Sequence, residues 1–158
     1  MQRQNEAKHL RVWLYVSESC MTDAEADPAI EDIVQVSREK NRHLAVSGAL
    51  LFTRQRFAQF LEGPEEGVNA VKASILCDKR HQLVTTVCWA IRKVRLFKGW
   101  SLAYSGASQY MASILNQVDL GDKAIPHKVC EELTYLFGEF ARTEILDCQG
   151  PISKRDGR

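Results

Sequence analysis

Apolar and polar positions recur with two different periods in the first part of the chain. Residues 10–17 (LRVWLYVS) are apolar on both faces of an extended chain, which is typical of a central strand covered on both sides. From residue 28 to about residue 42 the apolar positions recur at helical spacing. Asp27 followed by Pro28 predicts the start of this helix, with Asp27 as its cap.

The next two apolar runs are short and predict a hairpin. Residues 45–53 and 57–62 suit two strands, and the polar turn between them makes an antiparallel pair the simplest arrangement. Gly48 lies inside the first of these strands. A glycine there either marks a bulge or lets another group approach the backbone closely.

The rest of the chain continues the alternation of helix and strand. A second helix is predicted to open at Pro64 and to end near Lys79. A long apolar strand is expected over residues 83–91, and a final strand over residues 96–104. The order βαββαβ with an added fifth strand is that of a ferredoxin-like α+β sandwich, with both helices on one face of the sheet.

Two further amphipathic segments follow this unit. Residues 108–118 and 126–146 are predicted to be a C-terminal helix pair that covers the other face of the sheet. We therefore expect one domain over residues 9–105, a helical extension over residues 106–147, and a disordered tail over residues 148–158. A chain of 158 residues has little room for a second, catalytic domain.

Composition removes several classes of partner. The formal net charge is +1, from 21 Lys and Arg against 20 Asp and Glu, so no charge excess favours nucleic acid or an anionic membrane. No apolar run approaches the roughly 20 residues of a membrane span, and the polar amino terminus lacks the apolar core of a signal peptide. The five cysteines are scattered and lack zinc spacing, so we expect reduced thiols in a cytoplasmic protein without a metal site.

Three polar side chains stand where the pattern favours apolar ones. Gln59 lies between Phe57 and Leu61 at period two, so these three side chains leave the strand on the same face. Burying an unpartnered amide costs on the order of 2 kcal/mol or more, so Gln59 needs polar partners, either neighbouring protein groups or a ligand. Ser37 and Asn41 end the buried face of the first helix. Asn41 is either a C-terminal cap or a ligand-binding amide.

These residues fall within a series of motifs in a fixed order. The motifs are LYVS in the first strand, SREKN at the end of the first helix, then VSGALLF, FAQFLEG, DKRH and FKGW. Over roughly residues 10–104 the sequence resembles the BLUF domains, which are flavin-binding blue-light sensors. Six elements in order, each on the expected secondary structure, make the resemblance specific.

The resemblance implies that FAD lies between the two helices, its isoalloxazine ring in an aliphatic slot with a few polar groups at one end. The positions that match the family's flavin-binding residues are Ile33, Ser37, Asn41, Gln59, Ile75, Asp78, Arg80 and His81. The two isoleucines would flank the ring, and Asn41, supported by Ser37, would hydrogen-bond its polar edge. The DKRH residues would lie near the ribityl chain, although such a segment also suits a solvated helix end.

Tyr15 and Gln59 match the family's photochemical pair. A phenol can give up an electron and a proton together, and an amide both donates and accepts hydrogen bonds. The resemblance implies that blue light drives reversible transfer from Tyr15 to the flavin through Gln59, which ends in a new hydrogen-bond arrangement. The alternative for Tyr15 is a core aromatic whose hydroxyl is satisfied elsewhere. Trp100 and Leu102 occupy the signalling positions of the last strand, and Leu102 replaces the usual methionine.

The resemblance further implies a short BLUF photoreceptor that is not an enzyme, since no catalytic output domain follows residue 104. Its output is expected to pass through the C-terminal helices to a downstream protein partner or a homo-oligomer. One alternative is a light-independent interaction module that has lost its flavin or its response, a possibility that Leu102 keeps open. Another is an acylphosphatase-type enzyme, which needs a glycine-rich anion-binding loop where residues 18–28 are acidic and lack glycine.

Overall fold

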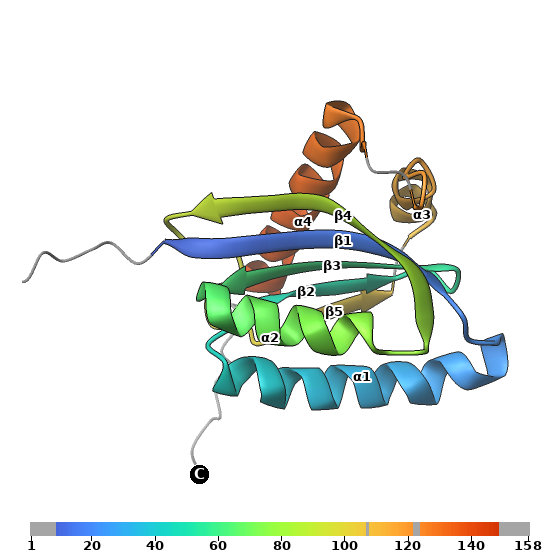
Figure 1. The fold of residues 1–158 in the computed structure, drawn as a ribbon, viewed down its shortest axis with the longest axis horizontal. Helices are drawn as coiled ribbons and strands as arrows, with labels where there is room; N and C mark the ends of the chain where they lie inside the picture. Colours follow the sequence, from blue (N-terminus) through green and yellow to red (C-terminus); the bar gives the residue numbers. More distant parts are fainter. Residues whose placement is uncertain (1–8, 107, 122–123, 149–158) are drawn as a thin grey trace, which may run out of the picture.

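A five-stranded mixed sheet forms the centre of the molecule (Figure 1). The computed structural model describes residues 9–106, 108–121 and 124–148, and its strand order is β4-β1-β3-β2-β5. All neighbouring strands are antiparallel except β2 and β5, which are parallel. The strands are β1 Leu10–Ser19, β2 Ser47–Phe52, β3 Arg56–Gly63, β4 His81–Arg92 and β5 Ala103–Gly106. The predicted α+β ferredoxin-like fold with a fifth strand is confirmed.

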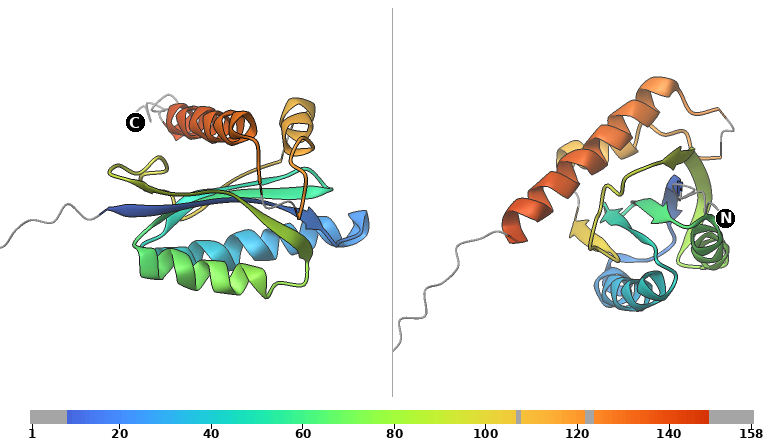
Figure 2. Two further views of the ribbon diagram at one scale, coloured as in Figure 1. Left: turned by 45° about the horizontal axis from the view of Figure 1, so that its top comes forward. Right: turned by 90° about the vertical axis from the view of Figure 1, so that its left-hand side faces the viewer.

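Helices cover both faces of this sheet (Figure 2). α1 (Asp23–His43) and α2 (Glu65–Leu76) lie on one face, and α3 (Gln109–Leu115) and α4 (His127–Cys148) lie on the other, as expected. Within the described part of the chain, no helix is both long and apolar enough to cross a bilayer. The predicted disordered tail, apart from its first residue in α4, lies outside the described residues.

The period of two along β3 separates two apolar cores. On the α1 and α2 side, Phe57 packs in a buried cluster with residues of α1, and Leu61 packs with residues of α2. On the α3 and α4 side, Phe60 joins the core that includes Phe137 of α4. Gln59 shares the face of Phe57 and Leu61, so it points toward the helices that were expected to hold a flavin.

The first helix begins earlier than the sequence pattern indicated. Its cap is Thr22, whose hydroxyl accepts from the backbone N–H of Glu25, while the Glu25 carboxylate accepts from the Thr22 backbone N–H. This reciprocal capping box satisfies two N–H groups that Asp27 would leave unpaired. Pro28 therefore lies inside α1 and not at its first position, where it removes one backbone hydrogen bond of the second turn.

The last strand is much shorter than predicted, since β5 holds only residues 103–106. Trp100 and Leu102 therefore precede the strand in which they were expected. The segment before β5 is attached to the sheet mainly by isolated hydrogen bonds, such as that from the Gly48 N–H to the Trp100 carbonyl. Gly99 has a positive φ of 83°, which turns the chain out of an extended path.

Gly48 does not mark a bulge, and its role is to let β2 and β3 approach closely. β2 and β3 pair without a register shift, and a Cβ atom added at Gly48 would lie 2.0 Å from the carbonyl oxygen of Phe60. No side chain fits at that distance, so β2 has to carry glycine here.

The Gly48→Ala variant is accordingly expected to lose about 3 kcal/mol of unfolding free energy, or to fail to fold, because the β2–β3 backbone has to separate. Gly106→Ala is the matched control, since an added Cβ there meets no atom within 4 Å. Urea unfolding of both variants measures the difference. Equal stability of the two would show that β2 can move away from Phe60 at little cost.

Candidate functional site

A cavity lies between α1, α2 and the sheet. Its volume is about 80 Å³, and its lining residues are Tyr15, Ile33, Val36, Ser37, Leu50, Phe57, Gln59, Ile75, Asp78, Arg80 and His81. Both residues of the predicted photochemical pair and six further predicted flavin-binding positions line it together, although they come from six different elements and loops. Asn41, Trp100 and Leu102 do not line it.

The hydroxyl of Tyr15 donates a 2.6 Å hydrogen bond to Oε1 of Gln59. The two side chains meet because residues 15 and 59 are directly opposite in the antiparallel pairing of β1 and β3. Burial, and secondly the negative charge of Asp78, raises the pKa of Tyr15 well above its usual range, so the phenol keeps its proton. Gln59 Nε2 has no hydrogen-bond partner within the described residues, which leaves a donor facing the cavity.

His81 is fixed by hydrogen bonds at both ring nitrogens. Its Nε2 lies 2.7 Å from the carbonyl oxygen of Ile75, which can only accept, so Nε2 carries the proton. In the neutral ring, Nδ1 then accepts from the hydroxyl of Ser17 at 2.8 Å. The ring also meets the Tyr15 and Phe57 rings edge-on, with centroids 6.1 Å and 5.8 Å away. His81 therefore forms a rigid wall of the cavity.

Asp78 and Arg80 close the cavity at its outer side. Arg80 donates to both carboxylate oxygens of Asp78, the shortest contact being 2.6 Å, and its Nη1 lies 2.9 Å from Asp32 of α1. The hydrogen bonds from Arg80 hold the pKa of Asp78 below its usual range. The Arg80 side chain is 36% exposed, so it can move without disturbing the core.

Asn41 lies about one helical turn beyond Ser37 and is only 1% exposed. Its Nδ2 donates to the carbonyl oxygen of Ser101 at 2.9 Å, which attaches α1 to the segment before β5. Its Oδ1 is buried and has no partner among the described groups. An orphaned buried acceptor costs free energy unless a donor from elsewhere reaches it.

The BLUF family model, described as sensors of blue light using FAD, matches residues 10–103. The chain belongs to the BLUF family. A BLUF domain is a sensor that detects blue light with bound FAD, so the family supplies both the cofactor and the general function of this chain.

Curated relatives of this BLUF chain include much larger light-regulated proteins. It is 28% identical over 98 residues to "Photoactivated adenylate cyclase subunit beta" of Euglena gracilis, which is 62% of this chain and 11% of the relative. It is 38% identical over 71 residues to "Blue light- and temperature-regulated antirepressor BluF" of Escherichia coli (strain K12), which is 44% of this chain and 18% of the relative. The chain thus spans less than a fifth of the length of either relative.

Two solved BLUF proteins resemble the whole fold, C-terminal helices included. The dark-state structure of BlrB has a TM-score of 0.70 at 26% identity and covers 87% of this chain and 98% of its own. The photo-activated state of BlsA has a TM-score of 0.66 at 21% identity, covering 84% and 94%, and supports the fold alone.

The residues of the cavity fit a flavin in chemistry. Ile33 and Ile75 present aliphatic surfaces, and Gln59 Nε2 offers a donor for the polar edge of the ring. The unpartnered Oδ1 of Asn41 lies outside the cavity lining, about one helical turn beyond Ser37. Pockets for ligands of this size usually hold about 300 Å³ or more, so the cavity has to widen. Val36, which is 57% exposed, and Arg80 lie at its rim and can move outward.

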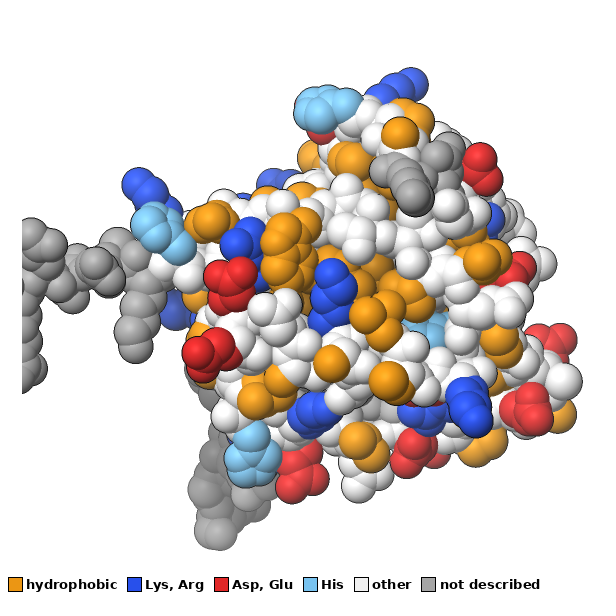
Figure 3. All heavy atoms as spheres, viewed as in Figure 1, with side chains coloured by type: hydrophobic (Ala, Val, Ile, Leu, Met, Phe, Trp, Pro, Cys, Tyr) orange, Lys and Arg blue, Asp and Glu red, His pale blue; other side chains and the backbone are white. Residues whose placement is uncertain are grey.

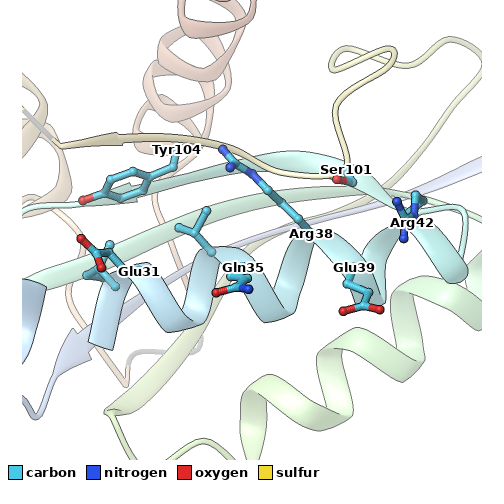
Figure 4. Close-up of a pocket in the computed structure, with 9 residues that line it drawn as sticks. Glu31, Gln35, Arg38, Glu39, Arg42, Ser101 and Tyr104 are labelled. Atoms are coloured by element: carbon cyan, nitrogen blue, oxygen red, sulfur yellow. The ribbon is translucent and has the colours of Figure 1, made fainter. Parts of the chain in front are cut away.

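A larger groove of about 820 Å³ lies on a different face of α1 (Figure 4). It is lined by Ile30, Glu31, Val34, Gln35, Arg38, Glu39, Arg42, Ser101 and Tyr104. None of these is a predicted flavin residue, and the groove is shallow and open, with mixed charges. The smaller cavity is the better flavin site because it contains the aliphatic slot and the paired amide.

Trp100 and Leu102 point to opposite sides of the sheet. Trp100 packs against the core beneath α3 and α4, on the face away from the flavin cavity. Leu102 is 1% exposed and packs with Leu50 and Phe57, which line the cavity. Leu102, and not Trp100, therefore packs behind the wall of this cavity.

Sequence patterns missed four residues of this site. Ser17 holds His81, and Val36, Leu50 and Phe57 line the cavity. Two of them could have been found from the sequence. Phe57 lies two residues before Gln59 and so shares its face of β3, and Leu50 is the residue of β2 that pairs with Gln59. Ser17 gave no signal, since its contact with a residue 64 positions away depends on the pairing of β1 with β4.

Proposed function

We propose that this BLUF chain senses blue light through a reversible change in the hydrogen bonding of Gln59. The observation that carries the proposal is the buried 2.6 Å bond from Tyr15 to Gln59 Oε1, with the Gln59 Nε2 donor facing the cavity. FAD, when bound, supplies the blue-light-absorbing ring and a strong one-electron oxidant.

The protein controls what happens to the proton of Tyr15. A phenol that loses an electron becomes strongly acidic, and a buried site disfavours the resulting charge. Gln59 Oε1 is the acceptor at hydrogen-bond distance, so the electron and the proton leave Tyr15 together. When the electron and the proton have both returned to Tyr15, the neutral Gln59 amide can remain in a different orientation. Its Nε2 then lies toward Tyr15 and its Oε1 toward the cavity, which exchanges a donor for an acceptor at the ring edge.

We propose that the output leaves through α4. Phe60, next to Gln59 in β3, lies 5.7 Å from Phe97 and 5.9 Å from Phe137, between ring centroids. Phe97 in turn lies 6.0 Å from Phe140 of α4. A shift of β3 therefore acts directly on the inner face of α4, and a changed packing of this helix would be recognised by a protein partner or a second copy of the chain.

This output needs no catalysis by the chain itself, and we propose that the chain is a non-enzymatic receptor without direct nucleic-acid contact. We also propose a cytoplasmic location, which agrees with the free thiols of Cys20, Cys77, Cys88 and Cys130.

The test is spectroscopic. Purified protein is expected to be yellow, with a flavin absorption that shifts reversibly to the red under blue light. A preparation that stays colourless after reconstitution with FAD would contradict the proposal and favour a light-independent interaction module. Size-exclusion chromatography and hydrogen exchange, each in the dark and under blue light, test the output. Identical elution together with unchanged hydrogen exchange in α4 would contradict the proposal that the signal leaves through α4.

A further inference from the structure

Three aromatic side chains lead from the flavin site to the protein surface. The rings of Tyr15 and Trp13 lie 4.5 Å apart between centroids, at an interplanar angle of 32°. Trp13 is completely buried and is the cross-strand partner of Trp89 in the β1–β4 pairing. Trp89 is 39% exposed. Each of these side chains can be oxidised by one electron, unlike the phenylalanines that surround the site.

Two cations cover the indole rings. Nζ of Lys72, from α2, lies 5.1 Å from the centroid of Trp13 and 4.7 Å from that of Trp89. The guanidinium of Arg11 lies 4.7 Å from the Trp89 centroid. Figure 3 shows basic and hydrophobic side chains next to one another on this face of the molecule, with acidic side chains nearby. A cation over an indole face stabilises the neutral ring and opposes a positive charge on it.

We propose that Trp13 and Trp89 form an electron-transfer path between Tyr15 and the protein surface, and that Lys72 restrains this path. The proposal deepens the proposed function, because it concerns the tyrosine assigned there as the electron donor. Contact between the Tyr15 and Trp13 rings gives a short first step. Lys72 bridges the two indoles, so one positive charge opposes oxidation of both.

The path balances as a transfer of one electron and one proton. Tyr15 that has lost an electron and its phenolic proton takes an electron from Trp13 and recovers a proton from the Gln59 side of its hydrogen bond. Trp13 is refilled by Trp89, whose exposed indole releases its N–H proton to water. A small-molecule thiol in solution then returns one electron and one proton to Trp89, and two such thiols combine as a disulfide.

For a light sensor, this path is a route by which the photocycle can lose its reversibility. An electron that enters from the surface takes Tyr15 out of its reversible cycle, whereas an electron that returns to Tyr15 within the site resets it. Lys72 favours the second outcome by making the indoles harder to oxidise. Because Lys72 lies over both rings, its charge lowers how often the sensor loses its reversibility.

Pulse radiolysis of the FAD-loaded protein in the dark tests the path without its photocycle. Azide radicals oxidise exposed indoles, and the indolyl absorption is expected to decay in a first-order, concentration-independent step as tyrosyl absorption grows. Trp89→Phe and Trp13→Phe are expected to slow this step on the order of tenfold or more. Lys72→Met is also expected to slow it, because the lysine charge makes an indolyl radical a stronger oxidant of Tyr15. Tyr15→Phe removes the electron donor to the indolyl radical, and Tyr135→Phe on exposed α4 is the matched control with an unchanged rate.

Unchanged rates in both tryptophan variants, or in Tyr15→Phe, would overturn the path. Should Trp13→Phe fail to fold, Trp89→Phe decides alone, since its side chain is partly exposed. The red shift under blue light is recorded separately on the same samples. Its absence would contradict the proposed function, whereas its presence with unchanged radical kinetics would contradict only the electron-transfer path.

Discussion

The Gln59→Leu variant is expected to bind FAD and to lose the light-induced red shift completely. Leucine keeps the volume and apolar character of the site, so the slot formed by Ile33 and Ile75 remains. Leucine has neither a donor nor an acceptor, so no group at this position can accept the Tyr15 proton. The hydrogen bond at the edge of the flavin ring can then no longer change from a donor to an acceptor. The measurement is the flavin absorption spectrum before and after blue illumination.

Gln55→Leu is the matched control for this change. Gln55 is exposed in the turn before β3, so the same substitution there is expected to leave the red shift intact. Tyr15→Phe, which removes only the hydroxyl, is expected to behave like Gln59→Leu. A normal photocycle in either site variant would mean that another pair of residues performs the photochemistry.

Glu62→Gln is expected to cause the second large effect, a loss of about 3 kcal/mol of unfolding free energy. Glu62 is completely buried at the end of β3. Its Oε1 accepts from the Phe97 N–H at 2.7 Å and from the Ser47 hydroxyl at 3.0 Å, and its Oε2 accepts from the Leu96 N–H at 2.8 Å. No ion pair with Glu62 is found in the part of the chain that the structure describes, so neutral donors alone offset its buried polar atoms.

An amide at this position turns one acceptor into a donor. One of the two backbone N–H groups then faces another N–H, and the attachment of residues 96–97 to β3 weakens. Urea unfolding measures the loss, and hydrogen exchange should increase at residues 96–97 and in α4, which Phe97 contacts. Glu66→Gln, on the exposed side of α2, is the control and is expected to change stability by no more than about 0.5 kcal/mol.

A Glu62→Gln protein as stable as the control would contradict this account of the segment before β5. An unstable protein with a normal red shift would indicate that Glu62 supports the route to α4 and not the photochemistry. That outcome is the expected one, since Glu62 and Gln59 leave β3 on opposite faces.

Local periodicity was sufficient to predict much of the lining of the cavity between α1, α2 and the sheet. The period of two in β3 places Gln59 on the helix side, and the helical period in α1 places Ile33 and Ser37 on the face that lines the cavity. The sequence also contains the signal for the observed start of α1, because Thr22 and Glu25 have the spacing of a capping box. Asp27 and Pro28 gave a competing signal of the same kind, and only the structure decides between them.

Other features depend on contacts between residues far apart in the chain. Asn41 was recognised as a candidate ligand, but its bond to Ser101 became visible only with the segment before β5 in place. The start of the last strand was predicted wrongly for the same reason. Residues 96–102 carry enough large apolar side chains to suit a strand locally. Their backbone is held in another path, because it donates to the Glu62 carboxylate and accepts from Gly48 and Asn41.

The sequence by itself determined the fold, the family and most of the side chains that line the cavity between α1, α2 and the sheet, because each follows from spacing within one element or from ordered motifs. The tertiary structure alone decided which side chains meet. The register of β1 against β3 and β4 brings Tyr15 onto Gln59 and places Trp13 opposite Trp89. Register is a relation between strands, and a single strand's pattern specifies the face of a residue but not the residue that it will contact.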